Sequence, residues 1–165
     1  MTRKKICMLG AYAVGKTSLV RRFVTSIFSE RYKTTLGVKI DKKSVRVGEQ
    51  EVDLILWDLA GEDAFVTVNV SYLKGSSGFL FVIDGTRPDT LNTALELEQR
   101  VDREYAGIPR IFLLNKCDLE ADWKIDPERL KGLEESGRML MKTSALSGAG
   151  VEESFLRLAE AMLRE

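Results

Sequence analysis

The octet Gly10-Ala-Tyr-Ala-Val-Gly-Lys-Thr17 follows an apolar run, Ile6 to Leu9, and leads into a stretch of helical period. Its form, G-x-x-x-x-G-K-[ST], is typical of a phosphate-binding loop between a strand and a helix. The glycines let backbone N–H groups surround a β-phosphate, Lys16 reaches the β and γ oxygens, and the Thr17 hydroxyl can ligate Mg²⁺. The octet therefore predicts a nucleoside polyphosphate site, in preference to an ordinary glycine-capped turn. The residues expected around the phosphates are Ala13, Val14, Gly15, Lys16, Thr17 and Ser18.

Length and charge exclude several classes of function. The chain has 165 residues, with 25 lysines and arginines against 25 aspartates and glutamates, so its net charge is zero. We expect one domain over residues 1–165 and no nucleic-acid partner, because a neutral chain has no field that attracts polyanions. No apolar run approaches the ~18 residues of a membrane span, and no lipidation signal is present. We therefore expect a cytoplasmic protein with no membrane anchor in this chain. Its cysteines, Cys7 and Cys117, are expected to be reduced and buried.

Short apolar runs alternate with segments of helical period, which indicates βα units and a mainly parallel sheet. Two alternating segments flank Gly48 and Glu49 and predict a hairpin, so one strand should run antiparallel to the others. We expect an α/β fold with a six-stranded, mixed but mostly parallel sheet, about five helices on its two faces, and ligands at the carboxyl ends of the strands. The expected strands are Lys4–Leu9, Val38–Val47, Glu51–Asp58, Gly78–Asp84, Arg110–Asn115 and Met139–Thr143, and the expected helices are Gly15–Ser26, Asp63–Tyr72, Thr90–Ala106, Pro127–Glu135 and Val151–Leu163.

A second motif, Asp58-Leu-Ala-Gly61, ends an apolar strand about forty residues after the phosphate loop. At this place the Asp58 carboxylate can hold a metal-bound water, and the Gly61 N–H can meet a γ-phosphate. A D-x-x-G motif alone is weak evidence. Its position at the end of a neighbouring strand strengthens the prediction of a metal and γ-phosphate site.

A third motif, Asn115-Lys-Cys-Asp118, ends another apolar strand and predicts the base of the nucleotide. The Asp118 carboxylate can accept hydrogen bonds from guanine N1–H and the N2 amino group. Adenine has neither donor and would leave the carboxylate unpaired. Asn115 either meets the O6/N7 edge of the base or ties loops together, and the Lys116 stem lies along the ring. After the last strand, backbone N–H groups of Ser144, Ala145 and Leu146 are expected to recognise guanine O6.

These motifs, in this order, resemble those of the Ras-like small GTPases, with the Rab and Rho branches closest, over essentially the whole chain. The resemblance implies a P-loop NTPase fold of the Ras-like G-domain type, with GTP or GDP and Mg²⁺ as ligands. It implies that Phe28 stacks on guanine, that Tyr32 lies at the nucleotide, and that a threonine of Tyr32-Lys-Thr-Thr-Leu-Gly37 ligates Mg²⁺. Thr35 is the better candidate for that ligand, and Thr34 stays an alternative because the double threonine leaves the register open.

Two residues depart from the family pattern. The position after D-x-x-G is usually glutamine, which orients the attacking water, but here it is Glu62. A carboxylate can accept a hydrogen bond from water but cannot donate one to a phosphoryl oxygen, and it adds negative charge beside the γ-phosphate. We favour slow hydrolysis over the alternatives of Glu62 as a base or a solvated Glu62. Tyr12 stands where relatives carry a small residue, and it should obstruct an activator's arginine. Arg31, just before the two threonines, could supply an arginine in cis for hydrolysis, although an ordinary surface arginine is the favoured interpretation.

The resemblance implies a Mg²⁺-dependent GTP/GDP switch that hydrolyses GTP to GDP and phosphate, weakly because of Glu62. Lys16, Thr35 and Glu62 are the expected catalytic residues, and Thr17, Thr35 and Asp58 the expected metal-binding residues. Effectors, exchange factors and activating proteins are expected to bind switch loops near Glu30–Gly37 and Gly61–Tyr72. The alternative function is an interaction module that stays GTP-bound without useful turnover.

Overall fold

Seven strands form one mixed sheet in the computed structural model, which describes residues 2–24, 30–33, 38–59 and 70–164, with 30–33 and 70 described by their backbone only. The strand order is β2-β3-β4-β1-β5-β6-β7. β3 is antiparallel to β2 and β4, and the other neighbouring pairs are parallel, as the hairpin predicts. The strands are β1 (Thr2–Gly10), β2 (Glu30–Lys33), β3 (Lys39–Val47), β4 (Gln50–Asp58), β5 (Gly78–Asp84), β6 (Arg110–Asn115) and β7 (Leu140–Lys142).

All six predicted strands are present, and the edge strand β2 is an addition. β2 is a short segment, Glu-Arg-Tyr-Lys, that pairs only with β3. It lacks the alternation of apolar and polar residues that identifies a half-buried strand in a sequence. An edge strand of this kind is held by backbone hydrogen bonds, so the residue pattern did not predict it.

Four α-helices and two 3₁₀ helices accompany the sheet in the described part of the chain. The predicted helix Asp63–Tyr72 lies mostly outside the described residues, and its described end is the 3₁₀ helix Val70–Leu73. A second 3₁₀ helix, Cys117–Asp122, follows β6 and was not predicted. Cys7 is buried as expected, but Cys117 is only partly buried because it opens this surface turn; both thiols are free. The α-helices are α1 (Lys16–Phe23), α2 (Asp89–Tyr105), α3 (Pro127–Glu135) and α4 (Val151–Leu163).

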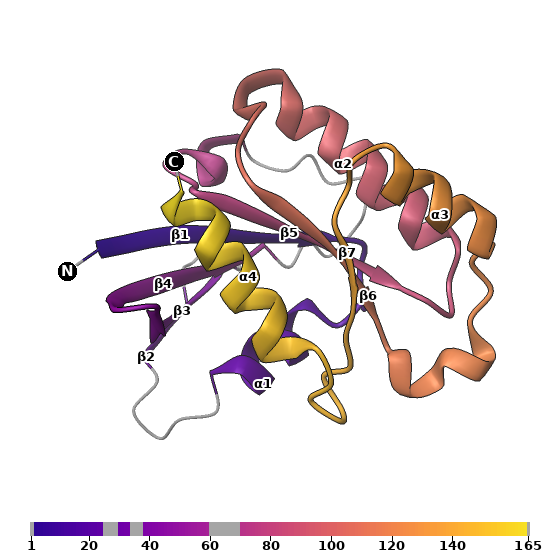
Figure 1. The fold of residues 1–165 in the computed structure, drawn as a ribbon, viewed down its shortest axis with the longest axis horizontal. Coiled ribbons are helices and arrows are strands. Elements are labelled where there is room, and N and C mark those ends of the chain that lie inside the picture. The colour runs from indigo at the N-terminus through magenta and orange to yellow at the C-terminus, as the bar shows by residue number, and fades with distance from the viewer. Residues whose placement is uncertain (1, 25–29, 34–37, 60–69, 165) are drawn as a thin grey trace.

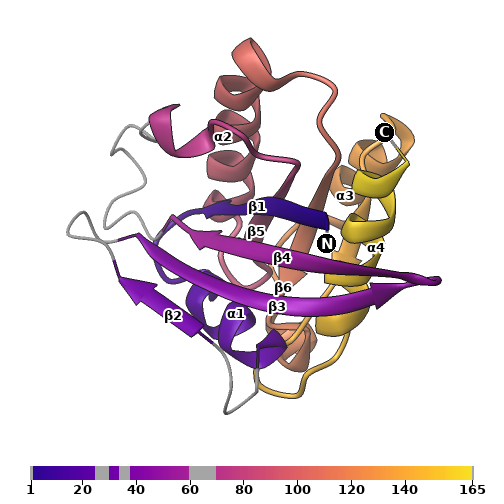
Figure 2. The ribbon, with the colours of Figure 1, turned by 90° about the vertical axis from the view of Figure 1, so that its left-hand side faces the viewer.

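The helices cover both faces of the sheet because the central strands are apolar on both sides. In β1, Ile6 and Met8 belong to the core beneath α1 and α4, while Cys7 and Leu9 belong to the core beneath α2 and α3. Figures 1 and 2 show these two layers on opposite faces of the sheet. Helices α1 and α4 also pack on each other, with the ring of Phe23 stacked on another phenylalanine ring at a centroid distance of 4.0 Å. The buried strands explain why parallel pairing was predictable.

β1 occupies the position at which the strand order reverses, since its neighbours are β4 on one side and β5 on the other. In open α/β sheets such a point leaves a crevice at the carboxyl ends of the strands. The residues that end these strands are Gly10, Asp58, Asp84 and Asn115. Three of these four lie in motifs that the sequence predicted, so the fold brings the motifs to one edge of the sheet.

Candidate nucleotide-binding site

The phosphate loop runs from the end of β1 to the first turn of α1, and two of its glycines have no room for a side chain. A Cβ on Gly10 would lie 2.6 Å from the carbonyl oxygen of Val82 in the neighbouring strand. A Cβ on Gly15 would lie 2.3 Å from Asn115 Nδ2, and Gly15 also has a φ of +104°. Only glycine adopts this conformation readily. Both glycines of the motif are therefore required by the shape of the loop.

The Lys16 side chain folds back over this loop. Its Nζ donates to the carbonyl oxygens of Gly10 at 2.8 Å and Ala11 at 3.1 Å, and the residue is only 5% exposed. Burial lowers the pKa of Lys16 to about 8, although the nearby negative charge of Asp58 acts in the opposite direction. Burial thus penalises the ammonium charge at this place. An anionic ligand beside Lys16 would compensate that charge.

Asp58 and Thr17 meet at the end of β4. The Thr17 hydroxyl donates to Asp58 Oδ2 at 2.5 Å, and the Asp58 side chain is almost fully buried. The other carboxylate oxygen, Oδ1, is buried and accepts no hydrogen bond from the described residues. A buried carboxylate oxygen with capacity to spare beside a hydroxyl suits a hard cation that keeps some of its waters. Thr17 and Asp58 therefore fit a Mg²⁺ ion held together with a ligand's phosphates.

At the other end of the site, Asp118 is oriented by a serine. The Ser144 hydroxyl donates to Asp118 Oδ1 at 2.8 Å, and Ser144 itself is fully buried. The backbone N–H of Ser144 donates to the carbonyl oxygen of Ala149 at 2.9 Å. This N–H is therefore engaged within the protein, and its role toward guanine O6 stays a prediction. The N–H groups of Ala145 and Leu146 also remain as candidates.

Asn115 ties loops together, which is one of the two roles that the sequence left open. Its Nδ2 donates to the carbonyl oxygen of Val14 at 2.9 Å, and its Oδ1 accepts from the Thr143 hydroxyl at 3.1 Å. Asn115 is 1% exposed, so both contacts are shielded from water. The phosphate loop, β6 and the segment after β7 are joined through this one side chain. The phosphate loop and the predicted base-recognition motif are thereby held in a fixed relation.

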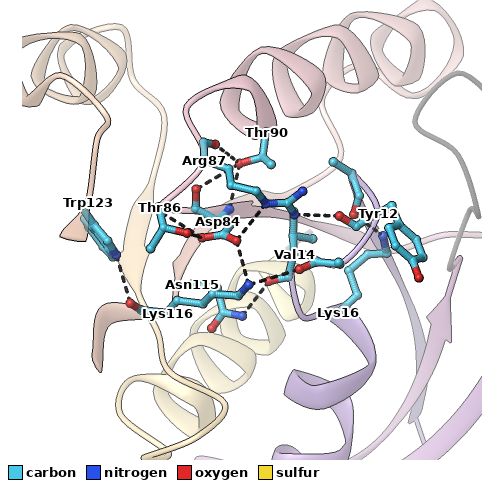
Figure 3. A network of polar contacts seen from close by, with 12 residues as sticks. Tyr12, Val14, Lys16, Asp84, Thr86, Arg87, Thr90, Asn115, Lys116 and Trp123 are labelled. Atoms are coloured by element: carbon cyan, nitrogen blue, oxygen red, sulfur yellow. Dashed lines mark hydrogen bonds and ion pairs between the residues drawn. The ribbon is translucent and has the colours of Figure 1, made fainter. Parts of the chain in front are cut away.

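Lys116 forms a second link between the two ends. Its Nζ pairs with Asp84 Oδ2 at 2.7 Å (Figure 3). The same Nζ lies 3.3 Å from the carbonyl oxygen of Ala13. The backbone of Lys116 has a φ of +69°, which is uncommon for a residue other than glycine. Its carbonyl oxygen accepts from Trp123 Nε1 at 3.0 Å. Trp123 and Asp84 thus hold Lys116 at its backbone and at its side chain.

Asp84 is a site residue that the sequence analysis missed. Burial alone would raise its pKa, but hydrogen bonds from Lys116, Thr86 and Arg87 outweigh burial and lower the pKa to about 2. Asp84 is 1% exposed and ends the apolar strand β5, as Asp58 ends β4 and Asn115 ends β6. This shared position was the signal that would have identified it.

The structure brings together the predicted residues of the phosphate loop, Asp58, and the loops after β6 and β7. A hollow of about 350 Å³ lies over the phosphate loop between Tyr12 and Lys116, and the Tyr12 side chain is 65% exposed at its rim. Leu146 is 79% exposed in the loop after β7. Predictions for Phe28, Thr34, Thr35, Gly61 and Glu62 lie outside the described residues, as do the side chains of Arg31 and Tyr32.

This fold and this loop define the class of P-loop nucleotide-binding proteins. The Ras family model matches residues 5–164. Ras-related protein Rab-13 of Canis lupus familiaris is 33% identical over 161 residues, which cover 96% of this chain and 79% of the relative. Ras-related protein RABA5b of Arabidopsis thaliana is 35% identical over 163 residues, which cover 98% of this chain and 73% of the relative. GTP-binding protein YPT1 of Saccharomyces cerevisiae is 34% identical over 158 residues, which cover 94% of this chain and 76% of the relative.

The chain belongs to the Ras family of small GTP-binding proteins, with Rab-like relatives, and its fold is that of the Ras-like G domain. Membership implies guanine nucleotide and Mg²⁺ as ligands, and Ras family GTPases hydrolyse GTP. Proteins of this family bind regulators as well as nucleotides. None of the helices in the described ranges combines the length and the apolarity needed to cross a bilayer.

Proposed function

We propose that residues 1–165 act as a single G domain, a Mg²⁺-dependent GTP/GDP switch with slow intrinsic hydrolysis. The observation that carries the proposal is the link between the two ends of the site. Lys116 and Asn115, from the predicted base-recognition motif, contact the Ala13 and Val14 carbonyl oxygens of the phosphate loop. One ligand with a base at one end and phosphates at the other fits this arrangement.

Guanine specificity is the first part of the proposal. The Ser144 hydroxyl occupies Asp118 Oδ1, so the carboxylate is held in one orientation and Oδ2 keeps its acceptor capacity. Guanine offers two neighbouring donors to such a carboxylate, and adenine would leave it unpaired at a cost of about 1–3 kcal/mol. GTP with Mg²⁺ should therefore raise the melting temperature, and ATP with Mg²⁺ should not. Equal stabilisation by both nucleotides would contradict this assignment of Asp118.

The phosphates and the metal form the second part. Lys16, Thr17 and Asp58 are already grouped at the end of β1 and β4. Thr17, Asp58 and the predicted Thr35 would hold Mg²⁺, which neutralises phosphoryl charge when it is bound. Burial has lowered the pKa of the Lys16 ammonium group to about 8, and a phosphate oxygen beside it would raise that pKa again and so favour the charged form. These residues bind and orient the polyphosphate.

Slow hydrolysis is the third part, and it follows from Glu62. A carboxylate at this position can orient water but cannot donate to the phosphoryl oxygens, and its charge opposes the developing negative charge. We expect Glu62→Gln to accelerate single-turnover conversion of GTP to GDP by about tenfold or more. A Glu62→Gln variant no faster than the wild type would remove Glu62 as the cause of slow hydrolysis.

Tyr12 bears on regulation. Its exposed ring stands at the rim of the hollow over the phosphate loop, where an arginine supplied by an activating protein would enter. We propose that such activators fail on the wild type and that Tyr12→Gly admits them. Arg31 is the candidate for an arginine in cis, and an Arg31→Ala variant with unchanged single-turnover hydrolysis would remove it from consideration.

One experiment separates the switch from its alternative, a module that stays bound to GTP. Purified protein is loaded with GTP and Mg²⁺, and conversion to GDP is followed in a single turnover beside Glu62→Gln. Conversion at the usual intrinsic rate of small GTPases, or faster, would exclude the permanently GTP-bound module. No conversion by the wild type over many hours, and none by Tyr12→Gly with an activating protein present, would exclude the switch.

A further inference from the structure

Arg87 lies in the turn between β5 and α2 and belongs to none of the motifs that predict the site. Its Nε donates to Asp84 Oδ2 at 3.1 Å, and its Nη2 donates to the main-chain oxygen of Tyr12 at 2.7 Å. The same Asp84 oxygen accepts from Lys116 Nζ. Figure 3 shows the contacts of Arg87 and Lys116 converging on Asp84, and that of Arg87 continuing to the phosphate loop.

Three successive carbonyl groups of the phosphate loop each accept a hydrogen bond from a different side chain. These side chains come from the turn after β5 and from the residues at the end of β6, so the loop is held from outside by elements far away in the sequence. The three contacts are Arg87 Nη2 to Tyr12 O at 2.7 Å, Lys116 Nζ to Ala13 O at 3.3 Å and Asn115 Nδ2 to Val14 O at 2.9 Å.

Holding a carbonyl group also fixes the next N–H group. A trans peptide is planar and points its C=O and its N–H to opposite sides. When Arg87 holds the Tyr12 carbonyl, the N–H of Ala13 must point away from Arg87. Successive N–H groups of this kind are what a phosphate loop offers to a β-phosphate. Ala13 itself has a φ of +61°, an uncommon conformation for alanine that persists only when its surroundings impose it.

We propose that Arg87 is a positioning residue for the phosphate-binding amide of Ala13. It acts through the Tyr12 carbonyl and is anchored by Asp84, whose side chain is 1% exposed. The inference rests on the proposed guanine-nucleotide function of this site. The inference separates two parts of that site, because it assigns the contact of Arg87 to binding of the β-phosphate and not to binding of the base.

The test compares GDP with GMP, because GMP has the base but no β-phosphate. Both affinities are measured by competition against a fluorescent GDP analogue, together with the ³¹P chemical shift of the β-phosphorus of bound GDP. Arg87→Met keeps the apolar stem and removes both donors. It should weaken GDP by about five- to tenfold, the effect of one or two hydrogen bonds, and leave GMP within twofold. The β-phosphorus resonance should shift.

Two further variants complete the test. Arg87→Lys keeps one charged group that can reach Asp84 or the Tyr12 carbonyl but cannot fork between them, so its loss of GDP affinity should be intermediate, about two- to fivefold. This variant also carries the test if Arg87→Met does not fold. Arg100→Ala removes an exposed arginine of α2 and is the matched control, with GDP and GMP affinities unchanged.

The outcomes separate the inference from the function on which it rests. GDP affinity and the β-phosphorus shift both unchanged in the Arg87 variants would overturn the inference. Equal losses for GDP and GMP would also overturn it, because Arg87 would then act on the base through Asp84 and Lys116. A wild-type protein that binds neither nucleotide would overturn the proposed function itself.

Discussion

The two ends of the proposed site use different kinds of chemical group, the backbone at one end and side chains at the other. At the phosphate end the loop offers backbone N–H groups, and its shape depends on glycines such as Gly15 and on side chains that hold its carbonyl groups from outside. At the proposed base end the group expected to recognise guanine is a side chain, Asp118, which another side chain, Ser144, orients. A backbone site tolerates an unusual side chain wherever that chain points outward, which is why Tyr12 fits there at 65% exposure. A side-chain site has no such tolerance.

The Asp84 carboxylate connects the two ends through two positively charged side chains. Its single Oδ2 atom accepts from Lys116, which belongs to the base-recognition motif, and from Arg87, which reaches the phosphate loop. A disturbance at this carboxylate should therefore reach both ends. A disturbance at Ser144 should remain at the base end.

The largest expected effect is at the phosphate end. Gly15→Ala places a Cβ 2.3 Å from Asn115 Nδ2 on a backbone with a φ of +104°, so the loop must move and the Asn115 contact with Val14 is lost. Strain and the lost hydrogen bond together should weaken GDP binding by roughly a thousandfold, or about 4 kcal/mol. Titration calorimetry with GDP measures this.

The matched control for that substitution is Gly132→Ala. Gly132 lies in α3 with open space around its Cβ position, so alanine should stabilise the helix by roughly 0.5–1 kcal/mol and leave GDP binding unchanged. A Gly15→Ala variant that binds GDP like the control would show that the loop does not depend on this glycine.

The next effect concerns the charge of Lys16 in the nucleotide-free protein. Its pKa of about 8 in the folded state lies below the 10.5 of the unfolded chain, so between these values the unfolded state binds more protons. Stability should therefore rise from about pH 8 to 10.5, by about 3 kcal/mol at most from this residue. Urea unfolding against pH measures the rise, which Lys16→Met should lack and Lys131→Met, at an exposed position of α3, should keep. Parallel profiles for the wild type and Lys16→Met would contradict the prediction.

The link between the two ends should respond to acid. The pKa of Asp84 is about 2 when folded and 3.8 when unfolded, so its contribution to stability is present above pH 3.8 and is lost as the pH falls toward 2. Asp84→Asn should lower the free energy of unfolding by about 2 kcal/mol at pH 7. Chemical unfolding at pH 7 and pH 3 should show this difference shrinking, while exposed Asp122→Asn shows none. A difference independent of pH would mean that the charge of Asp84 is not what stabilises the network.

The smallest effect is at the base end. Ser144→Ala removes the hydroxyl that orients Asp118, which should weaken GTP binding by roughly fivefold, or about 1 kcal/mol, and narrow the preference for GTP over ATP. Competition binding with both nucleotides measures it. Ser136→Ala, at the exposed end of α3, should change neither value. If Ser144→Ala leaves the preference intact, the orientation of Asp118 has another source.

Much of the fold was predictable because its strands are buried. The strand Gly78–Asp84 was predicted with its observed bounds, since every one of its residues is buried and the run is apolar up to the final carboxylate. The polar edge strand Glu30–Lys33 was missed because its pairing relies on the backbone. Asp84 was predicted to end a strand but not to serve the site, since no short motif surrounds it.

The sequence alone predicted the class of ligand and the order along the chain of the strands other than β2, because the phosphate loop, N-K-x-D and the buried apolar runs are local patterns of residue types at fixed spacing. Tertiary structure decided which groups act together. Arg87 and Tyr12 are 75 positions apart, and only the parallel arrangement of β1, β5 and β6 brings their contact about. The same arrangement assigned Asn115 to tying loops and left Asp84 to join the phosphate end to the base end. Such contacts depend on which strand ends are neighbours, and no local pattern of residues encodes that.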